Sequence, residues 1–195
     1  MQRNKKEFEI KDLIIKAKSG KINNVEKKYV IEMIKQEDDD LYQYLYIIGR
    51  SNLTVYEHLF AKYLEYYQDP EIIRLSLQVL CHFWRKTEKY LSYVVAYANE
   101  NEWDIIGNVR SMAIDIIGNL LKNKKQYANK EKRMIKLLLT WFKDESVDID
   151  IREDCYLALG KAFGKKPLQE LPFAGKHFDL KKDIDMKIIE WAEKL

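Results

Sequence analysis

The chain has 195 residues, of which 47% are hydrophobic and 33% charged, and its formal net charge is +3 at pH 7. This balance is typical of a globular chain with a domain-sized core and excludes an intrinsically disordered protein. The charge is too small to indicate nucleic-acid binding by itself, and the apolar runs are too short to span a bilayer. Seven glycines and three prolines leave long uninterrupted stretches, which favour an all-α fold.

The N-terminus and the cysteines bear on location. Residues 1–7 are polar and charged and no apolar segment follows them, so we expect no signal peptide and a cytoplasmic protein. Cys81 and Cys155 fall at apolar positions of expected helices, as reduced core thiols do. The high Lys, Ile, Asn and Tyr content is typical of a bacterial gene with low GC content.

The first expected elements are two helices, Glu9–Lys18 and Asn24–Gln36, which meet at Ser19-Gly20. We expect this pair, within residues 1–37, to cap the N-terminal end of the fold. The acidic run at 37–40 then precedes a helix over 41–49, where the helix dipole favours negative charge. Contact of the run with a basic partner is the alternative interpretation.

The middle of the chain continues with helices. A helix is expected over 53–68, and Asp69-Pro70 ends it and begins the next helix, 71–85, with Pro at the first helical position. Further helices are expected at 90–101, 103–122, 130–143 and 149–163, with a closing helix at 183–195. Residues 165–182 hold Pro167 and Pro172 and should form a loop, either a packing strap or a functional segment.

The stretch 103–122 shows the clearest helical periodicity. Asp104 stands where an N-cap belongs. One stripe is apolar: Ile106, Val109, Ala113, Ile116 or Ile117, and Leu120. A second stripe is mostly polar: Asn108, Met112, Asp115, Asn119 and Lys122.

Degenerate copies of this stretch occur on both sides. When Arg74, Arg110 and Arg152 are aligned, each follows a β-branched residue and precedes apolar residues three and seven positions later. Residues 41–49 fit the same frame without an Arg. The windows end at Gly49, His82, Gly118 and Gly160, which are 33, 36 and 42 residues apart. Periods of this size, each with two helices, are typical of helical solenoids.

These windows resemble HEAT repeats, most clearly at Asp69-Pro70-Glu71-Ile72-Ile73-Arg74 and at Asp148-Ile149-Asp150-Ile151-Arg152 followed by Ala158-Leu159-Gly160. The resemblance covers about residues 38–164 and implies a single right-handed α-solenoid domain of about five helix pairs. In that family the Arg-bearing helices line a concave surface that grips another macromolecule.

The resemblance therefore places a partner-binding surface on the polar positions of these helices. The candidates are Tyr42, Tyr46, Arg74, Gln78, Asn108, Asp115, Asn119, Glu153 and Tyr156. For Arg74, and for Arg110 and Arg152 at the matching positions, an inter-repeat ladder with Asp69, Asp104 and Asp148 is the favoured alternative.

Signals for catalysis, metals and cofactors are weak. His58, His82 and His177 lie far apart in the sequence, and Cys81-His82 are adjacent, which cannot place two ligands on one helix face. The glycines are too scattered for a phosphate loop. We expect no enzyme, metal or cofactor.

The main alternative comes from Trp103-Asp104-Ile105-Ile106, which resembles part of the Trp-Trp-Asp-x-Val-Asp motif of HEAT-like alkylpurine DNA glycosylases. Glu102 replaces the first Trp and Gly107 the second Asp. DNA binding or base excision is therefore the second hypothesis.

The leading hypothesis is a non-enzymatic protein-binding module. The thirteen tyrosines, set among mixed charges, suit protein recognition better than phosphate contacts. A small cytoplasmic bacterial solenoid without a recognisable active site is consistent with an immunity protein that neutralises a toxin domain; a scaffold segment of a larger assembly is the third interpretation.

Overall fold

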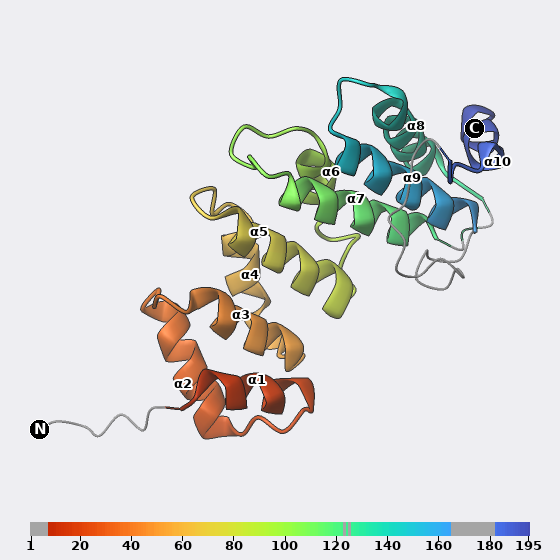
Figure 1. The fold of residues 1–195 in the computed structure, drawn as a ribbon. Helices are drawn as coiled ribbons and strands as arrows, with labels where there is room; N and C mark the ends of the chain where they lie inside the picture. Colours follow the sequence, from red (N-terminus) through yellow and green to blue (C-terminus); the bar gives the residue numbers. More distant parts are fainter. Residues whose placement is uncertain (1–7, 123, 125, 165–181) are drawn as a thin grey trace, which may run out of the picture. The chain divides into compact units, whose positions relative to one another are not determined.

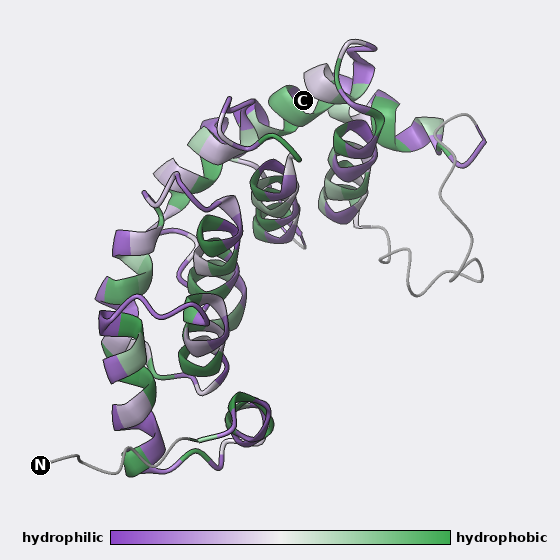
Figure 2. Cartoon of the chain, turned by 60° about the vertical axis from the view of Figure 1, so that its left-hand side comes forward, coloured by the Kyte–Doolittle hydropathy of each residue, from purple (hydrophilic) through white to green (hydrophobic). Residues whose placement is uncertain are grey.

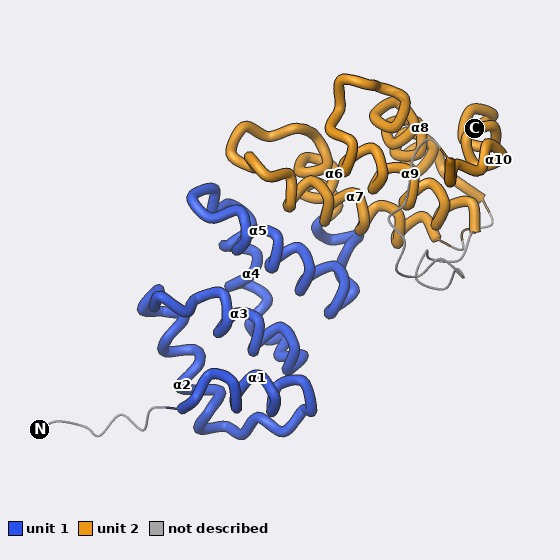
Figure 3. Tube along the Cα trace, in the orientation of Figure 1, with its two compact units in different colours: residues 1–90 blue, residues 91–195 orange. Residues whose placement is uncertain are grey.

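The computed structural model describes residues 8–122, 124, 126–164 and 182–195. These residues form helices joined by turns, and none of them lies in a strand, so the expected all-α class is confirmed for this part of the chain (Figure 1). The chain divides into two compact units, residues 1–90 and 91–195 (Figure 3). The expected loop falls almost wholly on residues 165–181, outside the described ranges. None of the described helices is long and apolar enough to cross a membrane.

Unit 1 contains α1 (Ile10–Lys18), α2 (Asn24–Lys35), α3 (Leu41–Arg50), the 3₁₀ helix η1 (Thr54–Tyr56), α4 (Glu57–Tyr63), α5 (Pro70–Leu77) and the π-helix η2 (Gln78–Phe83). Its helices begin where the sequence provides caps. Asn23 and Glu26 form a capping box at α2, and the Asp69 carboxylate accepts N–H groups of Glu71 and Ile72. The expected helix 53–68 is shorter than predicted, because the α-helical part covers only α4.

Helix α3 is the centre of unit 1, since α1, α2, α5 and η2 all pack against it. Gly49 permits the closest approach, because a Cβ atom there would lie 2.4 Å from a methyl group of Val79. Trp84 Nε1 donates to the Gly49 carbonyl at 3.1 Å. The expected helix 71–85 changes from α to π geometry after Leu77, and Trp84 N–H bonds to the Val79 carbonyl five residues earlier.

Unit 2 contains α6 (Leu91–Ala98), α7 (Asn108–Leu121), α8 (Asn129–Lys143), α9 (Ile149–Phe163) and α10 (Met186–Glu193). Helices α6 and α7 pack together, as do α8 and α9, and α7 packs extensively on α9. A Cβ atom on Gly107 would meet Ile151, and one on Gly118 would meet Ala158. The contacts advance in the same direction along both helices, so α7 and α9 run parallel. Figure 2 shows that helices in both units carry an apolar side and a polar side.

Helix α7 begins later than the apolar pattern predicts. Val109, Ala113, Ile116 and Ile117 of the predicted stripe are buried, but Ile106 is 84% exposed and does not belong to the buried side of the helix. The reason is Gly107, whose φ of 76° places it in the left-handed region and ends the preceding turn. The N-cap residue of α7 is Gly107 and not Asp104, but the Asp104 carboxylate accepts the N–H groups of Val109 at 3.2 Å and Arg110 at 2.9 Å in the first turn.

The predicted arginine–aspartate ladder is wrong. Arg110 Nε donates to the Ala98 carbonyl at 3.1 Å, and Arg152 Nε donates to the Phe142 carbonyl at 3.0 Å. Each arginine thus satisfies a carbonyl at the C-terminal end of the preceding helix, where unpaired carbonyls carry partial negative charge. The corresponding residue of unit 1, Arg74, bonds to side chains instead.

Both cysteines are free and buried, as expected. Burial raises the pKa of Cys81 to about 11 and that of Cys155 to about 12, so both remain thiols at neutral pH. Cys81 belongs to unit 1 and Cys155 to unit 2.

Candidate functional site

The predicted partner-binding residues fall into two groups, one in each unit. Tyr42, Tyr46, Arg74 and Gln78 lie in unit 1; Asn108, Asp115, Asn119, Glu153 and Tyr156 lie in unit 2. Tyr156 is only 5% exposed, and its hydroxyl accepts the Asp185 N–H at 2.8 Å, so it holds the start of α10 and is not available at the surface. The other eight are exposed or half-buried.

In unit 1 the predicted residues bond to their neighbours. Arg74 Nη2 donates to the Tyr42 hydroxyl at 2.9 Å and links α5 to α3, while Arg74 Nε donates to Glu71 at 2.8 Å. The Lys18 ammonium lies 5.8 Å from the centre of the Tyr46 ring. The polar side of α3 and α5 therefore contributes to the cohesion of unit 1.

In unit 2 the parallel α7 and α9 share a polar face. Asn119 Nδ2 donates to one Asp115 oxygen at 3.0 Å, and Lys161 of α9 pairs with the other. Ser111 of α7 faces the Asp154 carboxylate of α9 and lowers its pKa. We define the polar face by the residues Asn108, Ser111, Asp115, Asn119, Asp150, Asp154 and Lys161.

The electrostatics of the polar face centre on Asp154. Burial raises the pKa of its carboxyl above the ordinary value, and the nearby Asp115 and Asp150 raise it further, while Ser111 and Lys161 oppose the shift. Asp154 is thus a carboxylate that loses water contacts and has two acidic neighbours. A cationic group supplied by a partner would relieve this unfavourable arrangement.

The sequence identified part of this face. The spacing on one helix predicts Asn108, Asp115 and Asn119. The sequence analysis misses Ser111, Asp150, Asp154 and Lys161, and the predicted Glu153 is not part of the polar face. Asp150, Asp154 and Lys161 are separated by four and seven residues, which puts them on one side of α9. That spacing was the available signal.

Glu57 is a carboxylate whose pKa is shifted in the opposite direction to that of Asp154. Hydrogen bonds from Lys86 and Tyr90, and a further one from Lys89, lower its pKa to about 2. The Tyr90 hydroxyl donates to it at 2.6 Å. Because Lys86, Lys89 and Tyr90 all donate to Glu57, the cluster stabilises α4 against the segment after η2.

The described residues offer little for cofactor chemistry. They contain no group of three or more His, Cys, Asp or Glu side chains placed to hold a metal ion. A shallow hollow is lined by Gln126, Tyr127, Lys132, Trp191 and Leu195. Tyr127 there donates to the Ala162 carbonyl at 2.6 Å and is 5.8 Å, between ring centres, from Trp191, so both rings serve packing.

Comparisons with known proteins give no relative: no family model, no curated protein and no solved structure matches the chain.

Proposed function

We propose that this protein is a non-enzymatic protein-binding module that holds a cationic partner on the polar face of α7 and α9. The observation that carries the proposal is Asp154, a partly buried carboxylate whose pKa is raised by burial and by Asp115 and Asp150. Such a group costs folding free energy when it is charged, and a site that costs stability is commonly kept for binding.

We further propose a HEAT-like, right-handed solenoid as the architecture. Two features of unit 2 support it: the parallel packing of α7 on α9, and the equivalent bonds of Arg110 and Arg152 to carbonyls of the preceding helices. Helices α7 and α9 would then be neighbouring inner helices, and the polar face would belong to the concave side.

The most concrete form of this function is a bacterial immunity protein that neutralises a toxin domain. A toxin that acts on nucleic acid needs a cationic surface for phosphate contacts. An anionic face such as that around Asp115 and Asp154 would occlude that surface by charge complementarity.

No observation favours the glycosylase alternative. Asp104 is 8% exposed and occupied by the backbone N–H groups that begin α7. Trp103 packs edge-on against Tyr97, with ring centres 5.3 Å apart. The acidic polar face would repel phosphate.

The test uses Asp154→Asn, which removes the charge and keeps the shape. Because the pKa of Asp154 is raised in the fold, its charged form is disfavoured, so the variant should unfold at a higher denaturant concentration at pH 7. The same variant, and Asp115→Asn, should weaken binding to the product of the neighbouring gene by about tenfold or more, with a reduced dependence on salt.

Glu190→Gln, an exposed site on α10, is the matched control and should alter neither property. Binding that is unchanged in both aspartate variants would exclude the polar face. A chain that retains no co-expressed protein and rescues no toxic neighbour would contradict the immunity role.

A further inference from the structure

Three isoleucines are exposed at one end of unit 2. Ile105 is 92% exposed and Ile106 84%, both in the connection between α6 and α7, and Ile149 at the start of α9 is 56% exposed. Aliphatic side chains with this much exposure bury little apolar surface and add little to the stability of the core. Clustered apolar surface of this kind on a folded protein commonly marks a contact with another molecule.

The two connections that carry these residues lie beside each other. Helices α7 and α9 run parallel, so both begin at the same end, and a Cβ atom on Gly107 would lie 3.4 Å from Cδ1 of Ile151. Figure 1 shows the α6–α7 and α8–α9 connections at the same end of the α7–α9 pair. The isoleucines therefore belong to one surface.

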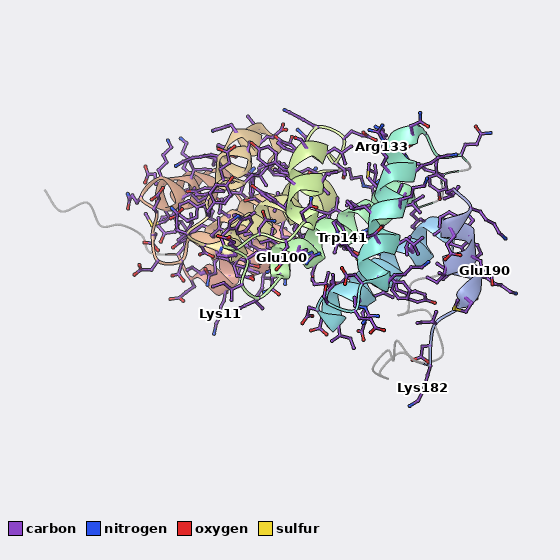
Figure 4. All side chains as sticks on the ribbon, turned by 90° about the horizontal axis from the view of Figure 1, so that it is seen from above. Lys11, Glu100, Arg133, Trp141, Lys182 and Glu190 are labelled. Atoms are coloured by element: carbon purple, nitrogen blue, oxygen red, sulfur yellow. The ribbon has the colours of Figure 1, made fainter. Side chains whose placement is uncertain are left out.

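That surface is bordered by acidic residues. The segments 99–109 and 144–151 contain no Lys or Arg, although the whole chain has a net charge of +3. Their exposed carboxylates are Glu100, Glu102, Asp144, Glu145, Asp148 and Asp150. Hydrogen bonds from Ser146 lower the pKa of Asp144, which favours its charged form. Figure 4 labels Glu100 in this border and Trp141 on α8.

The connection is held in place rather than left unsupported. The Gly107 N–H bonds to the Asp104 carbonyl at 2.9 Å, and the Asp104 carboxylate accepts the first N–H groups of α7. Trp103 packs on Tyr97, and the Arg110 guanidinium lies 5.3 Å from the centre of the Trp141 ring. A surface held in this way loses little entropy on binding.

Charge decides which partner fits. Exposed isoleucines could in principle contact nucleic acid or a membrane. The carboxylates, however, would repel both nucleic acid and an anionic membrane. A cationic segment with an apolar side would bury the isoleucines and pair its charges with the border. We propose that this surface, the isoleucine edge (Ile105, Ile106, Ile149 and their acidic border), docks a cationic amphipathic segment of a partner protein.

The isoleucine edge is tested with the full chain and a fluorescent synthetic helix of leucine and lysine, by fluorescence anisotropy. Two comparison peptides separate the contributions: one with every leucine replaced by serine, and one with every lysine replaced by glutamate. We expect the leucine–lysine peptide to bind at least about tenfold more tightly than either, with an affinity that falls as salt rises.

Two double variants then locate the site: Ile105→Ser with Ile106→Ser, and Glu100→Lys with Glu102→Lys. Each should weaken binding about tenfold or more, because each removes one of the two kinds of contact. Matched controls are Val55→Ser, at a valine that is 75% exposed in η1, and Glu190→Lys on α10; both should bind as the parent does. Circular dichroism checks that every variant keeps its helices.

The proposal is overturned if the serine–lysine peptide binds as well as the leucine–lysine peptide, or if the edge variants bind as the controls do. It is also overturned if Asp154→Asn abolishes probe binding while the isoleucine variants retain it, since the probe would then occupy the polar face. Different results would therefore contradict the proposal for the isoleucine edge and the proposed function of the polar face.

Discussion

Two carboxylates with opposite surroundings illustrate what single residues contribute in this chain. Glu57 receives three donors and its pKa falls to about 2, whereas Asp154 is partly buried beside two other acids and its pKa rises. The ionised form of Glu57 therefore stabilises the folded protein, whereas the ionised form of Asp154 destabilises it. A residue that lowers stability at the surface is the better candidate for binding.

Glu57→Gln should lower the free energy of unfolding at pH 7 by about 1–3 kcal/mol, because it removes charge-assisted bonds from Lys86 and Lys89. The folded pKa of about 2 lies below the ordinary 4.5, so the parent's advantage is fully present above about pH 4.5. It should disappear as the pH falls through about 2. Urea unfolding of parent and variant between pH 2 and 7 measures the difference.

Glu37→Gln is the control, since the ion pair of Glu37 with Lys62, at 3.5 Å, is exposed to solvent and its loss should change little at any pH. A Glu57 variant as stable as the parent at neutral pH would show that the cluster makes no net contribution.

At the scale of helices, two glycines that look alike in the sequence have different roles. A Cβ atom on Gly118 would lie 2.8 Å from the Ala158 Cα atom, so a side chain there would push α7 away from α9. On Gly160 it would meet only Cδ1 of Ile188 at 3.7 Å, an ordinary contact. Both residues end windows that align as repeats, but of the two only Gly118 is required by close packing.

Gly118→Ala should therefore lower the free energy of unfolding by about 1–3 kcal/mol through overpacking against backbone. Gly160→Ala, the matched control within a helix, should leave it unchanged or raise it by about 0.4–1 kcal/mol, because alanine restricts the unfolded chain. Thermal unfolding of both variants gives the comparison. Equal effects at the two sites would contradict the packing described for α7 and α9.

The helices also show how far the sequence predicts this structure. Helix α9 has the predicted bounds, Ile149–Phe163, because its Asp cap and its periodicity agree. Ile106 continues the apolar periodicity of α7 in the sequence but is exposed in the structure, since only the left-handed backbone of Gly107 reveals the break. The polar face is predicted only in part, because spacing on one helix is visible in the sequence but the approach of Ser111 to Asp154 depends on how α7 packs on α9.

At the scale of the whole molecule, the division at Tyr90 and Leu91 bears on cooperativity. Chains that divide into two compact units can unfold in parts, each unit with its own transition. The four tryptophans are unequally divided: Trp84 lies in unit 1, and Trp103, Trp141 and Trp191 lie in unit 2. Fluorescence therefore reports mainly on unit 2, while far-ultraviolet circular dichroism reports on both.

We expect the urea transitions from these two signals to differ, with separate midpoints for the two units. Trp84→Phe, which removes the reporter of unit 1, should leave only the unit 2 transition in the fluorescence signal. Superimposable transitions with a single slope, in the parent and in the variant, would show that the whole chain unfolds as one.

The two cysteines, one in each unit, give the molecule an internal reporter of local opening. Because neither sulfur is accessible in the folded state and both are held as thiols, an alkylating reagent in the medium reacts only when the surrounding helices separate. The rate of alkylation of each cysteine therefore reports how often the unit that contains it opens. A cysteine introduced elsewhere on the exterior could carry a dye without competition from the native pair.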